Sequence, residues 1–506
     1  MKAQNFKEQS FRQLLVTLCT KPGHQLLILP LITLVLTLLI NNGFMASDEY
    51  WTGITRYIPA QKASLTNLLK EDDVKSPTQL LPFYAVSQSA LKMGVEHPYE
   101  QYKITRITLG FINILLILLA FYLYNSTAVY SGAQGSISEN KFHYLLLAFF
   151  FPAAFVLTRP MFESMAAPWL TLGLVFSYRY DQKENKSDLF WGVLTASMAF
   201  CLRPQVGLCA LIFVILPILK KRWKDLFYVM GLGLVCFILA GLPDLFLRGQ
   251  FHQSLLAVTV YNFKEGHNYG QGPWYFYLMI LPVLYLLPVW GWFVKSSDWV
   301  TNLKSQRSLW ISSVLFIFLH SLFSQKFERF MIPVIPLFML VFSGLVFQLI
   351  QKKELSLKAV FALGFCLVFN FVLFFPASFG PSQINIINLA LFIDKNPQFS
   401  EIYNINESIT WIPDVFIDSK NRPLGFNEKP KADLEGLSAQ SCEVLVIVNE
   451  KNKLKFANDI DKYKLIQILD VNLIERVAFK LNPIHNERRS PLYLYSCLGA
   501  SSAVGI

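Results

Sequence analysis

The sequence predicts a multi-pass α-helical membrane protein, and three observations support that prediction. Hydrophobic residues make up 53% of the chain and charged residues only 16%, whereas soluble domains contain about 25% charged residues. Long apolar runs recur along the sequence, and most reach or approach the ~20 residues that a helix needs to cross a bilayer. Basic residues gather in those short loops that would share one side of the membrane.

The apolar runs predict about eleven transmembrane helices. Nine of them are long: 26–40, 104–124, 144–157, 206–219, 227–247, 275–294, 309–323, 331–350 and 360–375. Two more are shorter or interrupted, at 165–178 and 189–202. The first run follows a basic stretch and no small-residue cleavage site comes after it, so we expect an uncleaved signal anchor.

The basic residues predict which side of the membrane each loop faces. If the N-terminus is cytoplasmic and the sides alternate, every short basic loop falls on the cytoplasmic side, and the C-terminus is extracytoplasmic. The residues sorted in this way are Lys2, Lys7, Arg12, Lys21, Arg179, Lys183, Lys186, Lys220, Lys221, Arg222, Lys224, Lys295, Lys304, Arg307, Lys352, Lys353 and Lys358. This sorting explains the net charge of +11, so no nucleic-acid partner is expected.

Three polar segments interrupt or follow the spans, and all three face outward in this topology. They are the loop 41–103, the loop 244–274 and the tail 380–506. The chain therefore divides into a transmembrane domain over 1–379 and a small extracytoplasmic α/β domain over 380–506. In the tail, the patterns predict a helix at 381–394 and strands at 444–448, 463–469 and 492–497. A protein with most of its polar sequence outside is expected to act there.

The seven cysteines form no CxxC pair and have no metal-ligand spacing. Five lie in or beside apolar segments, where a buried thiol is the usual case. Cys442 and Cys497 both fall in the outward tail, and whether they form a disulfide stays open. No metal and no other cofactor is expected.

Charged and polar residues cluster at the outward ends of the predicted spans. The clusters contain Asp48 with Glu49, then Arg159, Arg203 and His267, and lastly Lys326 with Glu328 and Arg329. Each has a simpler explanation: arginines at helix ends extend to lipid headgroups, an acidic pair is often only solvated, and Lys-x-Glu-Arg forms internal ion pairs. Unrelated residues of this kind would scatter to both membrane faces, so their convergence on one face favours a site.

The composition of these clusters suits the cleavage of a glycosyl phosphate. Cations or hydrogen-bond donors hold the leaving phosphate, on which negative charge builds in the transition state. A carboxylate takes the proton of the acceptor hydroxyl. One carboxylate is sufficient for an inverting single displacement.

The motifs resemble those of glycosyltransferase family 22, the GT-C-fold mannosyltransferases of the GPI-anchor and N-glycan-precursor type, from about residue 44 to 336. The family's F-x-x-P-D-E-x-x-Q stretch is similar to Phe44–Trp51, T-R-T-x-x-N-S to Thr158–Ser164, and I-R-P to Leu202–Pro204. Its N-F…F-Y-G-x-H-P-W-x-W-Y resembles Asn262-Phe263 with Tyr269–Tyr277, and its H-K-E-x-R-F-x-x-P-x-x-P resembles Gln325–Phe330 with Pro333 and Pro336.

The chain departs from the family at several positions. Ser47 replaces a proline, Gly272 and Gln325 replace histidines, and residues 71–77 replace a tryptophan-rich T-W-E-W segment in the first outward loop. Pro160 and Glu163 also differ from the family motif. That first loop shapes the acceptor site in the family, so the acceptor is left open, and the chain is expected to be a distant member, with a bacterial source favoured.

The resemblance implies a hexosyltransferase that moves mannose from a polyprenyl- or dolichyl-phosphate donor to a glycan or glycolipid, with inversion and without a metal. It also implies roles for the matched residues. Asp48 is the expected general base, supported by Glu49. The expected contacts to the donor phosphate and substrate are Arg159, Arg203, His267, Lys326, Arg329, Glu328, Trp274 and Tyr269.

Two other functions are alternatives to glycosyl transfer. A transporter or flippase would place ionisable or helix-breaking residues near the bilayer midplane, often in repeats, and the sequence contains neither a repeat nor a mid-span charge pair. A structural subunit with a degenerate site is the second rival, because two family histidines are missing. The sugar, including other lipid-phosphate sugars, and the oligomeric state stay open. The membrane is the bacterial cytoplasmic membrane, or the ER membrane for a eukaryotic source.

Overall fold

The computed structural model divides the chain into two compact units. The helical unit contains residues 1–38, 64–82 and 106–374, and the sheet unit contains 39–63, 83–105 and 375–506. Within them the structure describes residues 24–44, 49–54, 57–58, 75–130, 137–268, 270–285, 295–350, 356–405, 412–418, 421, 425–426, 443–455, 460, 463–483 and 486–496. Each unit is described by itself.

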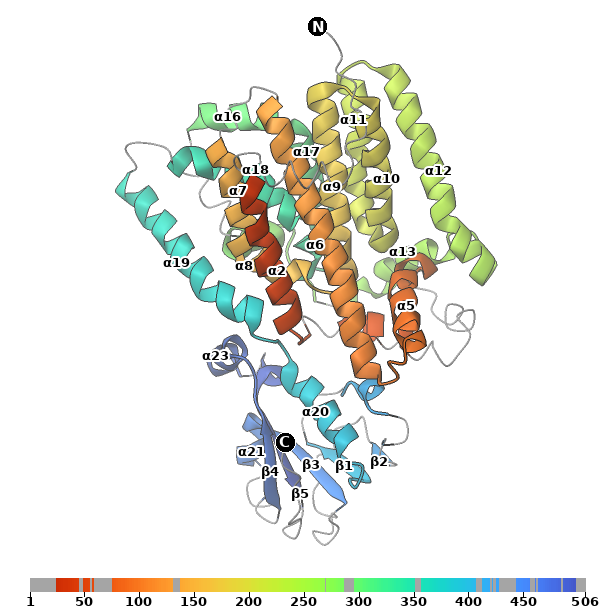
Figure 1. Ribbon diagram of the computed structural model, residues 1–506, viewed down its shortest axis with the longest axis vertical. Coiled ribbons are helices and arrows are strands. Elements are labelled where there is room, and N and C mark those ends of the chain that lie inside the picture. The colour runs from red at the N-terminus through yellow and green to blue at the C-terminus, as the bar shows by residue number, and fades with distance from the viewer. Residues whose placement is uncertain are drawn as a thin grey trace. The chain divides into compact units, whose positions relative to one another are not determined.

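The helical unit is a bundle in which α9 packs against both α10 and α17, and α10 packs against α12 (Figure 1). Several of its helices are broken by prolines or by short 3₁₀ turns. In chain order its elements are η1 His24–Leu27, α2 Ile28–Ile40, α5 Pro77–Lys92, α6 Pro98–Tyr130, α7 Ile137–Phe149, α8 Phe151–Leu157, α9 Phe162–Lys183, α10 Lys186–Leu202, η4 Pro204–Leu211, α11 Ile212–Leu219, α12 Trp223–Arg248, α13 Gln253–Glu265, η5 Gly266–Asn268, α14 Phe276–Tyr285, α16 Ser296–Ser305, α17 Arg307–Leu322, η7 Glu328–Val334, α18 Ile335–Ile350 and α19 Leu357–Phe379. The unit boundary falls within α2, α5, α6 and α19.

Small residues allow α9 and α10 to approach each other closely. A Cβ on Gly173 would lie 3.0 Å from the backbone nitrogen of Ala196 and 3.1 Å from the carbonyl oxygen of Gly192. In a bilayer the lipid tails are as apolar as the helix surface, so helices associate through close packing of this kind. The α10 helix begins at Asn185, whose side chain accepts a hydrogen bond from the backbone nitrogen of Ser187 and caps the first turn.

Four helices among the described residues are long and apolar enough to cross a membrane: Pro98–Thr127, Trp223–Arg248, Glu328–Phe347 and Leu357–Lys395. Three shorter apolar helices accompany them: Gln25–Ile40, Pro204–Leu219 and Arg307–Leu322. The membrane-protein class is thus supported, while the count of about eleven spans stays a prediction. In the apolar window of Glu328–Phe347, 89% of the residues are buried, against 17% in Trp223–Arg248 and Leu357–Lys395. The first is therefore an inner helix, and the other two expose an apolar surface suited to lipid.

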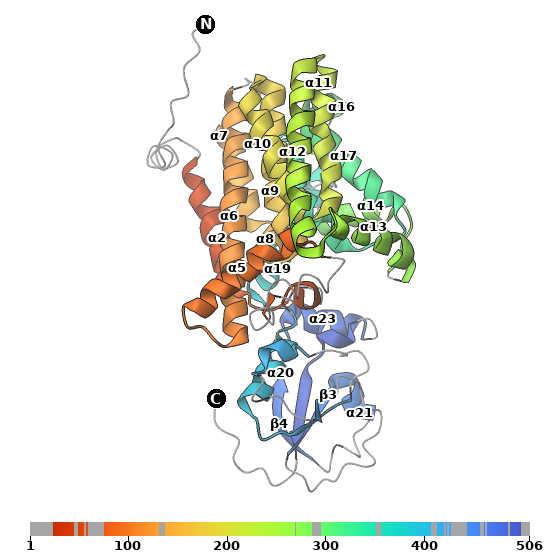
Figure 2. The same cartoon turned by 90° about the vertical axis from the view of Figure 1, so that its right-hand side faces the viewer.

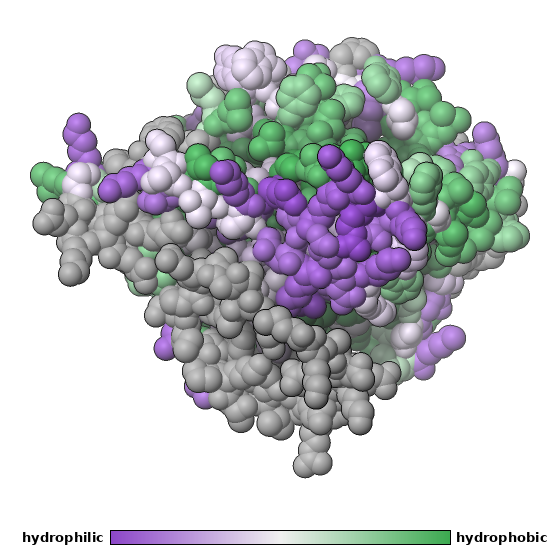
Figure 3. All heavy atoms as spheres, turned by 90° about the horizontal axis from the view of Figure 1, so that it is seen from above, coloured by the Kyte–Doolittle hydropathy of each residue, from purple (hydrophilic) through white to green (hydrophobic). Residues whose placement is uncertain are grey.

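Ion pairs join the C-terminal end of α9 to neighbouring elements of the bundle. Asp181 binds Lys220 at 3.4 Å and also pairs with Arg307. Arg179 binds Asp188 at 2.9 Å. The face seen in Figure 3 carries a patch of hydrophilic side chains bordered by hydrophobic ones. Three of the basic residues that the sequence assigns to the cytoplasmic side, Arg179, Lys220 and Arg307, thus have acidic partners within the unit.

The sheet unit contains a five-stranded sheet with the strand order β2-β1-β3-β5-β4. β1 is parallel to β2 and β3, and β5 is antiparallel to β3 and β4. Figure 2 shows α20, α21 and α23 beside the sheet. The elements are η2 Glu49–Ile54, α20 Ile384–Lys395, β1 Glu401–Asn404, η8 Asp414–Phe416, β2 Gly425–Phe426, β3 Val444–Asn449, α21 Glu450–Lys455, β4 Lys464–Leu469, α23 Leu473–Leu481, η9 Glu487–Arg489 and β5 Leu492–Ser496.

The apolar pattern of the tail accounts for this sheet. All six residues of β3 are buried, as expected for a central strand that is covered on both faces. The three predicted strands and the predicted helix are confirmed as β3, β4, β5 and α20, each within a few residues of the expected bounds. β1 and β2 are too short for the strand pattern to have predicted them. Cys442 and Cys497 lie outside the described residues.

Candidate functional site

A buried ion pair between Glu163 and Arg203 is the centre of the candidate site. Glu163 lies in the first turn of α9 and is 5% exposed. Arg203 follows α10 in an extended conformation, because the residue before a proline disfavours the helical region and Pro204 comes next. The Arg203 guanidinium nitrogen lies 2.9 Å from the Glu163 carboxylate oxygen. The ends of two neighbouring helices are thereby joined through opposite charges.

Two further cations act on the same carboxylate. The charges of Arg329 and Lys75, like that of Arg203, interact electrostatically with Glu163. We call these four residues the cation cluster. Three cations therefore act on one carboxylate, and a group of cations of this kind suits the binding of an anion.

Aromatic rings support the cations of the cluster. The Arg203 guanidinium lies 5.3 Å from the centre of the Phe330 ring, and the Lys75 ammonium lies 5.4 Å from the centre of the Phe162 ring. The Arg329 guanidinium lies 4.5 Å from the Phe327 ring. A ring face attracts a cation and excludes water from one side of it, so these contacts hold the charges in place without neutralising them.

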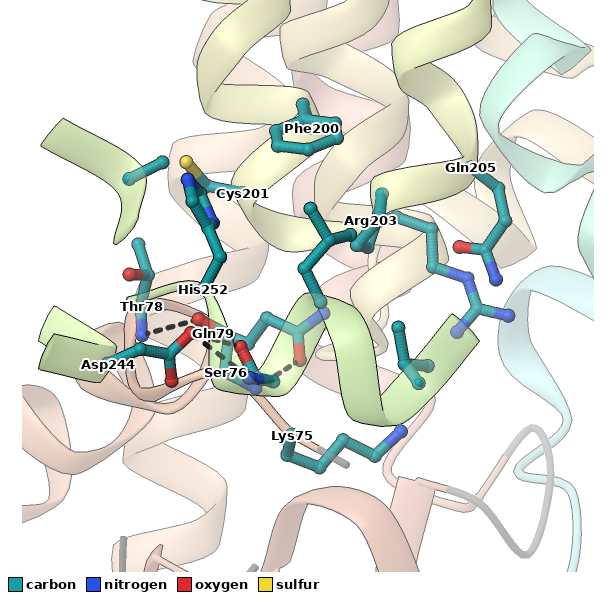
Figure 4. A pocket seen from close by; sticks show the side chains of 15 residues that line it. Lys75, Ser76, Thr78, Gln79, Phe200, Cys201, Arg203, Gln205, Asp244 and His252 are labelled. Carbon is teal, nitrogen blue, oxygen red and sulfur yellow. Dashed lines mark hydrogen bonds between the residues drawn. The ribbon is translucent and has the colours of Figure 1, made fainter. Parts of the chain in front are cut away.

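A solvent-open pocket borders the cluster. Lys75 and Arg203 line it, and Figure 4 shows both charged ends on the side of the pocket away from Asp244 and His252. The other polar lining includes Ser76, Thr78, Gln79, Gln205 and Ser254, and the apolar lining includes Phe200, Leu255 and Val258. The pocket thus combines cations with an apolar wall, which fits a ligand that has both an anionic and an apolar part.

A second buried charge pair, in the last turns of α12, holds the wall of the pocket together. The Arg248 guanidinium lies 3.4 Å from the Asp244 carboxylate, and both side chains are almost fully buried. The Ser254 hydroxyl donates to the same carboxylate at 2.5 Å, and Arg248 also donates to the carbonyl oxygen of Lys75. Helices α12 and α13 and the segment that carries Lys75 are therefore connected through these two buried charges.

The structure brings together two of the sequence motifs that were expected to contribute to the site. Gln271 and Gln325 form a short antiparallel bridge. Beside it, the backbone nitrogen of Lys326 donates a hydrogen bond to the backbone oxygen of Gly270 at 2.9 Å. A Cβ on Gly272 would lie 2.9 Å from Cγ of Lys326. A residue as large as histidine at position 272 would therefore displace Lys326, which explains the glycine found there.

The ammonium group of Lys326 binds the end of α17. It donates to the carbonyl oxygens of His320 at 3.0 Å and Ser321 at 3.1 Å, and also to that of Phe323. Burial lowers the pKa of this group. The last carbonyl groups of a helix have no partner within the helix, so Lys326 acts here as a C-terminal cap.

The other expected residues of the helical unit differ in burial and in their contacts. Arg159 is fully buried between α8 and α9, with its guanidinium 5.2 Å from the Phe155 ring. Trp274 is 66% exposed and contacts Tyr275. Glu328 is exposed at the start of η7. Tyr269 and the side chain of His267 lie outside the described residues.

Glu49 belongs to the sheet unit, where it begins a π-helical segment, Glu49–Ile54. Its side chain is 2% exposed, and the Tyr102 hydroxyl donates to one carboxylate oxygen at 2.9 Å. Burial and the charge of Glu49 raise the pKa of Tyr57 well above its ordinary value. Single π-helical turns are rare and occur frequently at functional sites. Asp48 lies outside the described residues.

Sequence reasoning did not assign Glu163, Lys75, Asp244 or Arg248 to the site. A signal existed for Asp244 and Arg248, because they are oppositely charged, four residues apart, at the end of an otherwise apolar helix. For Glu163, the signal was an acidic residue four positions after Arg159 at the end of an apolar run, and for Lys75 there was none.

Within the described ranges, no group of three or more His, Cys, Asp or Glu side chains is placed to hold a metal ion. Cys201, Cys209, Cys236 and Cys366, all in the helical unit, are free thiols.

Comparison with known proteins gives a family and a fold. The sequence model of the Alg9-like mannosyltransferase family matches residues 26–405. No curated protein matches the chain by sequence.

The solved structures of ArnT from Cupriavidus metallidurans are similar to this chain. The apo structure superposes with a TM-score of 0.55 at 13% identity, over 93% of this chain and 97% of that one. The structure bound to undecaprenyl phosphate gives a TM-score of 0.55 at 12% identity over the same shares. This likeness confirms the GT-C fold.

Proposed function

The chain belongs to the Alg9-like mannosyltransferase family, and from that premise we propose that it transfers mannose from a polyprenyl- or dolichyl-phosphate donor to a glycan or glycolipid acceptor. The family makes the chain a membrane glycosyltransferase. The sugar, the lipid phosphate that carries it and the class of acceptor are proposed beyond that class. The reaction is an inverting single displacement, which converts a β-linked donor into an α-mannoside.

The observation that carries the proposal is the cation cluster beside the pocket. When the glycosyl–oxygen bond breaks, negative charge grows on the phosphate oxygen that leaves. Lys75 and Arg203 line the pocket, and Arg329 acts on the same carboxylate as they do. The apolar side of the pocket, with Phe200, Leu255 and Val258, suits the first part of a lipid chain. A solved structure of the same fold contains undecaprenyl phosphate, which supports a lipid phosphate as the ligand.

In this reaction Asp48 acts as the general base. It takes the proton of the acceptor hydroxyl as the oxygen attacks the anomeric carbon, and Glu49 supports it. Arg203 and Arg329 bind the donor phosphate. Arg159, His267, Lys326, Glu328, Trp274 and Tyr269 surround the substrate or keep the surrounding helices in place. No resident metal is required, because side-chain cations supply the stabilising charge.

The proposed topology has about eleven spans, a cytoplasmic N-terminus and an extracytoplasmic C-terminus. In this topology the loops 41–103 and 244–274 and the C-terminal α/β domain, 380–506, share the extracytoplasmic side. Transfer therefore takes place on that side, in the bacterial cytoplasmic membrane or, for a eukaryotic source, in the ER.

The test is transfer by the purified protein in nanodiscs. Polyprenyl-phosphate mannose or GDP-mannose is supplied with a panel of glycan and glycolipid acceptors, and products are identified by mass spectrometry. We expect mannosylated product from the lipid-linked donor only, and none with Asp48→Asn at an equal protein level. Product from GDP-mannose alone would contradict the donor class, and equal transfer by Asp48→Asn would move the base elsewhere.

A further inference from the structure

The α23 helix of the sheet unit exposes an apolar stripe. Leu473, Val477 and Leu481 are spaced four residues apart, and they are 67%, 48% and 81% exposed. Side chains at this spacing lie on one face of a helix. The opposite face carries Glu475 and Phe479, which are buried against the rest of the unit. One face of the helix therefore packs on protein, and the other face exposes three large aliphatic side chains.

The start of α23 is fixed to the chain that directly follows α19. The Asn472 side-chain amide donates to the carbonyl oxygen of Pro381 at 3.2 Å. The backbone nitrogen of Gln383 donates to the two carboxylate oxygens of Glu475 at 3.0 and 3.1 Å. Figure 2 shows α23 and the first turn of α20 at the same end of the sheet unit.

That attachment sets the level of α23 relative to a bilayer. α19 is one of the four helices suited to cross a membrane, and its apolar side chains are exposed as far as Phe375. A nine-residue helix is roughly 13 Å long, so its whole stripe lies close to the point where α19 ends. The headgroup layer on each side of a bilayer is roughly 5–8 Å thick. Because α23 binds the residues that directly follow α19, the start of the stripe lies within a few residues of the end of a helix suited to cross the membrane.

The charges beside the stripe match a phospholipid surface. Arg476 and Lys480 follow one edge of it and are both exposed. Arg476 also pairs with Asp470, and Lys480 lies in the last turn of the helix. A helix with aliphatic residues on one side and basic residues at the border is the type that lies in the plane of the membrane interface.

We propose that α23 is an interfacial helix that inserts Leu473, Val477 and Leu481 between the lipids of the membrane that the protein spans, while Lys480 and Arg476 contact lipid phosphates. The helix thereby anchors the sheet unit to the outer surface of the bilayer. This inference does not depend on the donor or the sugar, because it follows from the exposed stripe and its attachment beside α19.

The test measures the depth of single positions in the full chain. An environment-sensitive fluorescent amino acid is introduced by codon suppression at Val477 or, separately, at Leu481, and the protein is placed in nanodiscs with lipids brominated in their tails. The matched control is Lys464, exposed at the far end of β4, roughly 16 Å along the strand from the end that leads to α23.

We expect the brominated tails to quench the label severalfold more strongly at Val477 and Leu481 than at Lys464. The emission at Val477 and Leu481 should also be blue-shifted. Emission from water-exposed labels at all three positions would overturn the proposal. So would a blue shift without tail quenching, because it would mean that protein, such as a second copy of this chain, covers the stripe. Both label positions are exposed, so neither substitution disturbs the core.

Discussion

Single buried charges have different roles in the two units. In the helical unit, Glu163 and Asp244 each neutralise a neighbouring arginine, and so keep the charges beside the pocket in place. In the sheet unit, Glu475 is buried and accepts hydrogen bonds from the backbone of Gln383, and no side chain in the part of the unit that the structure describes forms an ion pair with it. Burial of a carboxyl group disfavours its charged form, so Glu475 links the stability of the sheet unit to pH.

We predict that the stability of the sheet unit depends on pH. Burial raises the pKa of Glu475 from 4.5 to about 7, although the Gln383 hydrogen bonds and the Arg489 charge act in the opposite direction. Between those two values the folded state keeps a proton that the unfolded state has lost. The protonated Glu475 therefore contributes its full stabilisation of the folded state below pH 4.5. As the pH rises to about 7, the free energy of unfolding of the sheet unit falls, by at most about 3 kcal/mol.

Hydrogen exchange of α23 and β5 at pH 5 and pH 8, corrected for the intrinsic exchange rates, checks this prediction. Glu475→Gln should remove most of the difference, because the amide does not ionise. An equal pH dependence in Glu475→Gln and in the unchanged protein would show that another group is responsible.

Half of the cation cluster could be predicted from the sequence, because Arg203 and Arg329 were expected in the site whereas Glu163 and Lys75 were not. Arg203 was identifiable because a charged residue at the end of an apolar run, before a proline, is rarely placed there without a reason. The role of Lys326 was not identifiable, because its three carbonyl partners come from the turn at the end of α17. A sequence pattern gives the charge of a side chain but not the direction in which it points.

At the level of elements, the contact between α12 and α13 shapes the pocket. His252 begins α13 in the left-handed conformation, and its ring stacks on Phe237 at 4.0 Å and shares a 2.9 Å hydrogen bond with the Phe237 carbonyl oxygen. Gly241 faces that ring. The apolar run 227–247 predicts α12 well, whereas α13 was missed, because Gln253–Glu265 lies in a segment that was taken as a polar outward loop.

Gly241→Ala tests whether this contact sets the pocket. The new Cβ would lie 2.6 Å from both the His252 and the Phe251 ring, so one of them or the whole of α13 must move. Overpacking of this kind costs about 1–3 kcal/mol, and we expect a lower melting temperature together with slower transfer.

The matched control lies on the same helix. A Cβ on Gly231 meets nothing within 4 Å, and an alanine there favours the helix by roughly 0.5–1 kcal/mol. Gly231→Ala should therefore leave transfer unchanged and the melting temperature equal or higher. If both variants transfer at the normal rate, the close approach of α12 and α13 has no part in the function.

At the level of the whole molecule, the membrane class follows from composition, but the division into units does not. Residues 39–63 and 83–105 join the C-terminal region, and the backbone of Phe44 binds that of Ser382 at 2.7 Å. Tyr50 similarly hydrogen-bonds to Asp414. Contacts across more than 300 residues have no local periodicity, so the sequence pattern places the first loop outside without indicating what it packs against.

Two arginines give the most direct test of the claim that the cation cluster binds a lipid phosphate. Arg203 and Arg179 have equally buried side chains, at 16% exposed, and each lies 2.9 Å from one buried carboxylate. Arg203 borders the pocket, whereas Arg179 is at the other end of α9. Arg203→Gln and Arg179→Gln should therefore lose similar amounts of stability.

The deciding measurement is the rate of release of polyprenyl phosphate from polyprenyl-phosphate mannose as the donor concentration is varied. A charge-assisted hydrogen bond contributes about 1.5–3 kcal/mol, so Arg203→Gln should lower kcat/KM for the donor about 10- to 100-fold, while Arg179→Gln stays near the unchanged protein. Equal losses in the two variants, or no release of polyprenyl phosphate by the unchanged protein, would contradict the claim.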